Sequence, residues 1–216
     1  MQYHWLHKNI NNNKLIVFFG GWSFDFRPFE CLESNNYDVL MFYDYNNLEI
    51  PSKIPDYEEK ILITWSMGVF IAYYLKDKLP EFKRKIAING TPYPVDNERG
   101  IPFRTFDLTL KYAETGLKQK FYENVFANEE FLKKYLKTPV ERTIQNRVEE
   151  LNALNTLIKN TPVTYDGKFY DRAIVSNNDK IIPFKNQMNM WQNLAKVIDC
   201  GHFPFYNYKS WDEICN

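Results

Sequence analysis

The chain is 216 residues long, 44% hydrophobic and 17% aromatic, which excludes a disordered protein and favours a single domain, residues 1–216, with a large core. Its 27 basic and 27 acidic residues cancel, which argues against nucleic acid or an anionic membrane as the main partner. The apolar runs are far too short to span a bilayer, no signal-peptide pattern is visible, and the three cysteines have neither metal-ligand nor disulfide spacing, so we expect a cytoplasmic protein.

Short apolar runs bounded by turn residues recur along the chain and predict the strands of a mostly parallel sheet. The runs are rich in β-branched and aromatic residues and do not alternate with polar ones, which is typical of strands buried on both faces. Residues 1–7 predict one further, antiparallel edge strand. The six parallel strands are predicted at residues 15–19, 37–43, 60–64, 84–88, 172–175 and 195–198.

Helices are predicted between these strands, at residues 67–79 and 183–194, and the alternation indicates an α/β domain. Residues 91–161, after the fourth parallel strand, are predicted to form an almost wholly helical insertion. Within it, Asn128 predicts the N-cap of one helix, and Thr138-Pro139-Val140-Glu141 predicts a capping box for another. We expect this insertion to act as a lid over the carboxyl edge of the sheet, where open α/β sheets bind ligands.

Ser66 lies in the sequence Thr-Trp-Ser-Met-Gly, where a buried strand is predicted to end and a helix to begin, which is the layout of a nucleophile elbow. Asp179 and His202 follow two later strands, in the chain order that hydrolases of this architecture use. We therefore predict a catalytic triad in which His202 takes the Ser66 proton and Asp179 orients the imidazole. The backbone N–H groups of Trp22 and Met67 are the predicted oxyanion hole.

Each of these residues also has an ordinary structural interpretation. A serine before a helix is often only an N-cap, and a lone histidine is often structural. Asp179 could instead cap the helix that follows residue 183. Its rivals as the triad acid are Asp166, Asp171 and Asp199.

Five short motifs are spread over nearly the whole chain, from residue 15 to residue 205. They are Phe19-Gly20-Gly21-Trp22, Tyr43-Asp44-Tyr45, Trp65-Ser66-Met67-Gly68-Val69, Ile88-Asn89-Gly90-Thr91 and His202-Phe203-Pro204-Phe205. Together they resemble the BioG family, the pimeloyl-[acyl-carrier protein] methyl ester esterases of biotin synthesis. Thr64 stands where the common elbow has glycine, but the family does not require glycine there.

The resemblance implies an α/β-hydrolase that needs no cofactor or metal and removes the methyl ester from the far end of a pimeloyl chain tethered to acyl carrier protein. Such a substrate needs an apolar channel, and the acidic carrier needs a basic surface at its mouth. The aromatic residues expected to line the channel are Phe103, Phe106, Tyr112, Phe121, Tyr122 and Phe126. The expected substrate contacts are Gly21, Trp22, Trp65 and Phe126. The expected carrier contacts are Arg99, Arg104, Arg142 and Arg147, near the group Lys133, Lys134 and Lys137.

Other interpretations stay open at this point. The basic residues of the insertion could simply be solvated helix faces. The enzyme could hydrolyse small free esters without a carrier, or transfer its acyl group to an acceptor other than water. The fold could also serve as a ligand-binding module without catalysis. A monomer is the default expectation.

Overall fold

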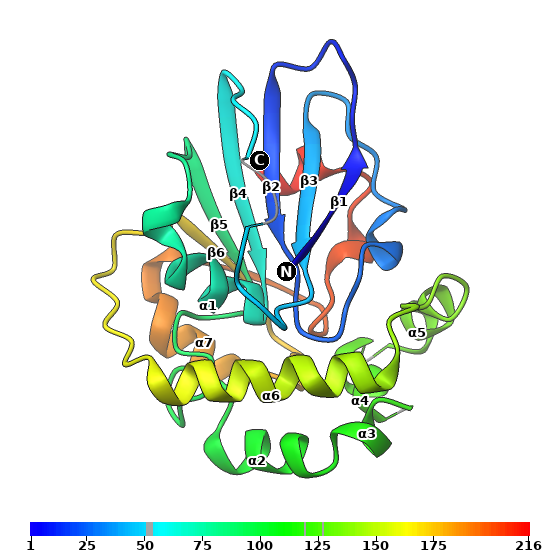
Figure 1. The fold of residues 1–216 in the computed structure, drawn as a ribbon, viewed down its shortest axis with the longest axis vertical. Coiled ribbons are helices and arrows are strands. Elements are labelled where there is room, and N and C mark those ends of the chain that lie inside the picture. The colour runs from blue at the N-terminus through cyan, green and yellow to red at the C-terminus, as the bar shows by residue number, and fades with distance from the viewer. Residues whose placement is uncertain (51–53, 119, 127) are drawn as a thin grey trace.

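A seven-stranded sheet forms the centre of the protein in the computed structural model, which describes residues 1–50, 54–118, 120–126 and 128–216 (Figure 1). The strand order is β1-β3-β2-β4-β5-β6-β7, and every neighbouring pair is parallel except β1 with β3. The predicted parallel sheet and its antiparallel edge strand are therefore confirmed. The strands are β1 (Gln2–His7), β2 (Lys14–Phe19), β3 (Asp38–Tyr43), β4 (Glu59–Trp65), β5 (Arg84–Ile88), β6 (Arg172–Ser176) and β7 (Ala195–Ile198).

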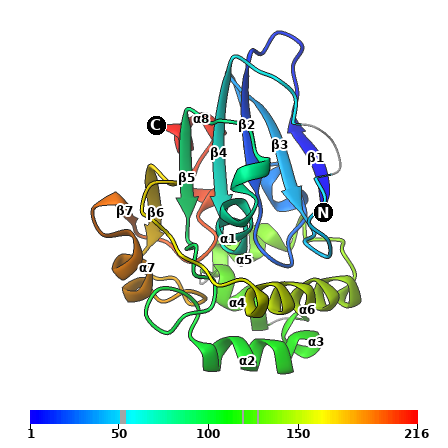
Figure 2. The ribbon, with the colours of Figure 1, turned by 60° about the vertical axis from the view of Figure 1, so that its left-hand side comes forward.

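The central strands bury both of their faces, which explains their unbroken apolar runs. In β2, Leu15, Val17 and Phe19 belong to the core on the side of α1, whereas Ile16 and Phe18 belong to the core on the side of α8. Figure 2 shows these two helices on opposite faces of the sheet. The helices are α1 (Met67–Tyr74), α2 (Phe103–Lys111), α3 (Ala113–Gly116), α4 (Lys120–Phe126), α5 (Glu129–Tyr135), α6 (Ile144–Asn160), α7 (Phe184–Trp191) and α8 (Trp211–Cys215).

Two predicted helices are shorter in the structure because 3-10 turns take over their last residues. After α1 comes η2 (Lys76–Lys78), and after α7 comes η3 (Gln192–Leu194). Two further 3-10 turns are η1 (Arg27–Phe29) and η4 (Phe205–Asn207). Among the described residues, no helix is long and apolar enough to cross a bilayer.

Helices α2 to α6 all lie between β5 and β6 in the chain, and they cover the carboxyl ends of the parallel strands (Figures 1 and 2). The Asn128 cap is confirmed, because its side chain accepts hydrogen bonds from the amides of Glu130 and Phe131. The capping box at residues 138–141 is wrong. Helix α6 begins only at Ile144, and Thr143 caps it by accepting a bond from the Asn146 amide.

The error at residues 138–141 has a physical reason in the loop that follows β2. The Glu141 amide donates to the carboxylate of Asp25 at 2.8 Å, and the Arg142 guanidinium donates to the Phe24 carbonyl at 3.2 Å. These bonds fix the segment before α6 in a non-helical conformation against the sheet. A tertiary contact of this kind leaves no local sequence signal, so the capping pattern alone placed the helix start too early.

Candidate active site

Ser66 lies on the turn between β4 and α1 with φ 57° and ψ −124°, a conformation that non-glycine residues rarely adopt. The turn is held by the Ser66 amide, which donates to the Ile88 carbonyl of β5 at 3.0 Å. Close packing also requires Gly68, because a Cβ there would collide with the carbonyl oxygens of Phe19 and Gly20 at the end of β2. The strain and the tight fit place the serine hydroxyl at the carboxyl edge of the sheet.

Ser66, His202 and Asp179 meet at this edge through hydrogen bonds. The distance from Ser66 Oγ to His202 Nε2 is 2.9 Å, and that from His202 Nδ1 to Asp179 Oδ2 is 2.8 Å. All three side chains are buried. The structure thus brings together the three residues that the sequence places after three different strands, β4, β6 and β7. An imidazole between a hydroxyl and a carboxylate is the arrangement that activates a serine.

The rival acids lie elsewhere. Asp171 accepts a hydrogen bond from the Lys85 amide, Asp199 accepts one from the Asn178 side chain, and Asp166 accepts one from the Lys168 amide. Asp179 does not cap α7, whose N-cap is Pro183, but its other oxygen orders the turn before that helix. Asp179 Oδ1 accepts from the amides of Ile181 and Ile182 at 2.8 and 3.0 Å, while Oδ2 faces His202. The same carboxylate therefore orders its own turn and orients the imidazole.

His202 is fixed through its backbone carbonyl. The indole Nε1 of Trp65 donates to this oxygen at 2.8 Å, and Asn89 Nδ2 donates to it at 2.9 Å. Asn89 also accepts from the Ser176 amide at 2.7 Å, which ties β5 to the end of β6. Trp65 was expected to contact substrate, but it is only 1% exposed and supports His202 instead.

The loop after β2 lies directly against the elbow. A Cβ built on Gly21 would lie 3.1 Å from the Ser66 Cβ and 2.9 Å from the Trp65 ring, so only a residue without a side chain fits between them. Gly21 is therefore a packing residue rather than a cavity-lining one. The next residue, Trp22, does line a cavity, as does Met67. Met67 directly follows Ser66 in the chain, and Trp22 follows Gly21, whose backbone packs against Ser66.

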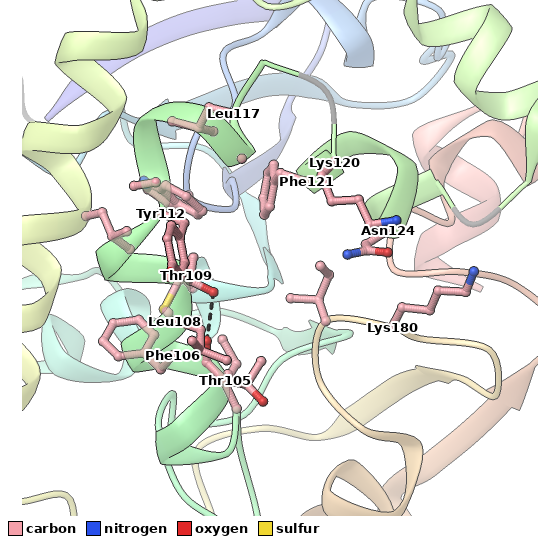
Figure 3. Close-up of a pocket in the computed structure, with 17 residues that line it drawn as sticks. Thr105, Phe106, Leu108, Thr109, Tyr112, Leu117, Lys120, Phe121, Asn124 and Lys180 are labelled. Carbon is pink, nitrogen blue, oxygen red and sulfur yellow. Dashed lines mark hydrogen bonds between the residues drawn. The ribbon is translucent and has the colours of Figure 1, made fainter.

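A largely apolar cavity of about 250 Å³ opens beside Trp22 and Met67, between the insertion and the sheet edge. Figure 3 shows Phe106 of α2 and Tyr112, the residue after α2, on one side of it, and Lys120, Asn124 and Lys180 on the other. Of the aromatic residues expected there, three line the cavity: Phe106, Tyr112 and Phe121. The others do not, since Phe103 is exposed and both Tyr122 and Phe126 are buried elsewhere.

The prediction that Phe126 contacts substrate is wrong, because its ring is fully buried in an aromatic core. It stacks on Tyr135 with ring centroids 4.7 Å apart and packs against Phe203 at 5.1 Å. Because Phe203 directly follows His202, this core supports the segment that carries His202. The helical spacing of aromatic residues cannot distinguish the two locations, because a core ring and a cavity ring have the same pattern.

Two of the four arginines expected to meet the carrier are buried and unavailable to it. Arg142 pairs with Glu150 at 2.9 Å and with Asp44 at 3.1 Å, and its side chain is 6% exposed. Arg147 donates to the Tyr122 hydroxyl, and its carbonyl accepts from the Trp22 indole at 2.8 Å. Arg142 turns inward because Glu150 on α6 is itself fully buried and needs a cation beside it, whereas Arg147 turns inward to the buried Tyr122 hydroxyl.

Glu150 links the insertion to the loops after β2 and β3. Besides Arg142, its carboxylate accepts from the Ser23 amide at 3.1 Å and the Tyr45 amide at 2.9 Å. Burial raises the pKa of Glu150 in spite of these contacts. Burial also acts to raise the pKa of Asp44, but Arg142 and the neighbouring amides outweigh it and leave that pKa lowered.

The other expected carrier contacts remain at the surface. Arg99 pairs with Asp96 at 2.9 Å and lies over the Tyr93 ring, while Arg104 is exposed on α2. Neither lines the cavity, whereas Lys120 and Lys180 do, and the sequence analysis named neither lysine. Within the described ranges, no group of three or more histidine, cysteine or acidic side chains is arranged to hold a metal ion.

The fold and the arrangement at the sheet edge define an α/β-hydrolase. An alpha/beta fold family hydrolase from Bacillus anthracis strain Sterne has a TM-score of 0.60 to this chain at 15% identity, covering 94% of this chain and 89% of that one. At such identity the likeness establishes the fold alone.

The chain belongs to the BioG family. The family model described as pimeloyl-ACP methyl esterase BioG matches residues 3–214. The crystal structure of BioG from Haemophilus influenzae has a TM-score of 0.91 to this chain at 27% identity and covers 100% of both chains. Family and fold together support an ester-hydrolysing role in biotin synthesis.

A curated relative from Bacteroides fragilis strain 638R, named malonyl-[acyl-carrier protein] O-methyltransferase, is 32% identical over 200 residues. That match covers 92% of this chain but only 39% of the relative, so the chain spans well under half of its length.

Proposed function

We propose that Ser66, His202 and Asp179 are the catalytic triad of an esterase that converts pimeloyl-[acyl-carrier protein] methyl ester to pimeloyl-[acyl-carrier protein] and methanol in biotin synthesis. The observation that carries this proposal is the chain of hydrogen bonds from Ser66 Oγ through the His202 imidazole to Asp179, at 2.9 and 2.8 Å, beside an apolar cavity. Membership of the BioG family supports the substrate.

The chemistry follows from the geometry of the triad. Ser66 Oγ attacks the ester carbonyl while His202 Nε2 takes its proton, and Asp179 stabilises the imidazolium that results. The amides of Trp22 and Met67 donate to the oxyanion. His202 then protonates the departing methoxide, so that methanol leaves and an acyl-Ser66 ester remains. Water activated by His202 releases the carboxylate and restores the serine.

The cavity suits the acyl part of this substrate. Its lining is largely apolar, so a methylene chain gains free energy on entering it, at about 0.8 kcal/mol for each buried CH₂. The insertion supplies most of this lining and, in the proposed function, acts as the lid over the ester. The two lysines at the cavity give the mouth a positive charge that an acidic carrier would meet (Figure 3).

The direct test is mass spectrometry of purified methyl-pimeloyl carrier protein incubated with the wild type and with Ser66→Ala. We expect the wild type to remove one methylene mass from the carrier and to release one equivalent of methanol, and the variant to do neither. Wild-type protein that leaves the carrier mass unchanged, or a variant that matches the wild type, would refute the proposal. A fluorophosphonate probe that fails to label Ser66 would favour a non-catalytic binding module.

A second experiment separates a carrier-dependent esterase from one that acts on small free esters. In Lys120→Glu/Lys180→Glu, both cavity lysines are reversed, although Lys120 also pairs with Glu123 at 3.5 Å. We expect KM for the carrier-bound ester to rise about tenfold or more and turnover of a small methyl ester to stay within about twofold. The matched control reverses two exposed lysines that do not line the cavity, Lys159 and Lys168. An unchanged KM for the carrier-bound ester would mean that the enzyme does not recognise the carrier here and would favour small free esters.

A further inference from the structure

Gln187 of α7 is a buried amide that contacts the proposed triad acid and that sequence analysis did not single out. Its side chain is completely buried, and Nε2 donates to Asp179 Oδ2 at 2.9 Å and to the Ile182 carbonyl at 3.0 Å. Its Oε1 atom is also buried and has no hydrogen-bond partner among the described residues. A buried polar atom left without a partner costs about 1–3 kcal/mol, so something must compensate for this orientation.

The orientation of the amide follows from the groups that it faces. Both Asp179 Oδ2 and the Ile182 carbonyl are acceptors, so an amide turned the other way would set its own oxygen against two oxygens. A hydrogen bond to an ionised carboxylate is about twice as strong as one between neutral groups. The negative charge on Asp179 therefore explains why the donor faces inward and the acceptor is left unpaired.

Asp179 consequently has four donors in all: His202 Nδ1 and Gln187 Nε2 on Oδ2, and two backbone amides on Oδ1. Donors to the charged form stabilise it and lower its attraction for a further proton. Gln187 and His202 both bond to Asp179 Oδ2. The amide therefore also weakens the electrostatic stabilisation that this oxygen gives to a protonated His202 ring. Gln187 thus acts on His202 through Asp179.

We propose that Gln187 is a positioning residue that fixes Asp179 and, by donating to the same oxygen that faces His202, weakens the stabilisation that this carboxylate gives to a protonated imidazole. The inference rests on the proposed function of the triad. Gln187 touches neither substrate nor Ser66, and its effect is carried entirely by the carboxylate between them.

The other charged and titratable groups near this pair stay constant when Gln187 is changed. Lys180, beside Asp179, and Lys185 on α7 are exposed. Asp199 is held by the Asn178 side chain at 2.7 Å. Burial raises the pKa of the Cys200 thiol, which keeps it neutral over the working range. A shift in His202 titration on changing Gln187 therefore reports on the amide.

The test is Gln187→Met, which preserves length and apolar bulk but removes the donor. The histidine titrations are followed by NMR, since the chain has only three histidines, and kcat/KM is followed against pH. We expect the His202 midpoint and the acid limb of kcat/KM to move upward by about 0.5–1 pH unit, which is a three- to tenfold loss of activity on that limb. At high pH the variant should approach the wild-type rate.

The matched control is Asn186→Ala, the preceding residue on α7. Asn186 is also buried and also donates two hydrogen bonds, to the carbonyls of Asn97 and Gly100, but it touches no triad residue. A merely structural role for Gln187 predicts lower activity in both variants with no shift of the midpoint. An unchanged His202 midpoint in Gln187→Met, or an equal shift in Asn186→Ala, would overturn the inference.

A second variant covers the case in which methionine disturbs folding. Gln187→Leu also removes the donor but fills the site with a branched apolar side chain, so the His202 midpoint should again move upward; an unchanged or lower midpoint would contradict the proposal. The NMR titration needs no catalysis. If the wild type proves inactive on methyl esters, the proposed function fails, while a shifted His202 midpoint would still establish the coupling of Gln187 to the imidazole.

Discussion

The sheet edge that carries Ser66, Asp179 and His202 and the helical insertion that covers it are held in place by different forces. At the edge, strained backbone fixes Ser66, and hydrogen bonds from the neutral side chains of Trp65, Asn89 and Gln187 fix His202 and Asp179. In the insertion, a buried cluster of charges joins α6 to the loops after β2 and β3. We therefore expect substitutions at the edge to lower activity with little change in the free energy of unfolding. Substitutions in the buried charge cluster should mainly lower the free energy of unfolding.

This difference shows that charges near an active site need not face a ligand. Glu150 accepts from the amide of Ser23, the residue after the proposed oxyanion donor Trp22. The indole of Trp22 in turn donates to the Arg147 carbonyl of α6. The insertion is therefore both a cover for the cavity and a support for the loop beneath it. A lid that moved as a rigid whole would have to break these buried bonds.

The largest effect in the edge region is expected from Ser66→Ala. Removal of the nucleophile should lower kcat on a methyl ester by at least about 10⁴-fold, because no other group at the site can form the acyl-enzyme. The free energy of unfolding should stay within about 1 kcal/mol of the wild type, since His202 is the one partner of this hydroxyl among the described residues. Steady-state kinetics and urea unfolding measure the two quantities. A marked loss of stability would mean that the edge and the insertion do not differ as argued.

In the insertion, Glu150→Ala should have its main effect on stability. Truncation leaves Arg142 buried without its closest anion and leaves two amides without an acceptor, so we expect the free energy of unfolding to fall by about 3–5 kcal/mol. Urea unfolding gives the value. Glu149→Ala is the control: its exposed carboxylate accepts from the Gln145 side chain, and its loss should cost under about 0.5 kcal/mol. Equal effects at the two positions would show that the buried cluster carries no special stability.

The sequence was most informative where a local pattern decides the structure. The apolar runs predicted the six parallel strands, because the central strands are buried on both faces and admit few polar residues. The meeting of Ser66, Asp179 and His202 followed from topology, since carboxyl ends of parallel strands share one edge. The Asn128 cap was also predictable, because a cap depends on three adjacent residues.

The failures all involve side-chain contacts in the folded protein that no local sequence pattern records. An arginine that pairs with a buried glutamate eight residues away, as Arg142 does with Glu150, looks in sequence like one on a solvated helix face. Gln187 carried no signal, because its role depends on a contact with Asp179 across a turn. The aromatic residues of the insertion divided between core and cavity, as Phe126 and Phe121 show, and periodicity alone could not separate them.

The smallest effect among the three substitutions is expected at Asp44, the second anion beside Arg142. Its dependence on pH tests whether charge holds the insertion in place. Asp44 has φ 60°, which asparagine tolerates well, so Asp44→Asn removes the charge with little backbone cost. At pH 7 we expect the variant to be less stable by about 1–3 kcal/mol, because the ion pair at 3.1 Å is lost. Chemical denaturation at a series of pH values measures the gap, which is the difference in free energy of unfolding between wild type and variant.

The direction of the pH dependence follows from the lowered pKa of Asp44 in the folded protein. A carboxyl whose folded pKa lies below its unfolded value stabilises the fold above the unfolded pKa of about 3.9, and this contribution disappears as the pH falls through the folded pKa. The gap between wild type and Asp44→Asn should therefore be full at pH 7 and shrink below about pH 4. A gap that stays constant down to pH 3 would mean that hydrogen bonds to Gln2 and Asn46, rather than the charge facing Arg142, hold this end of the cluster.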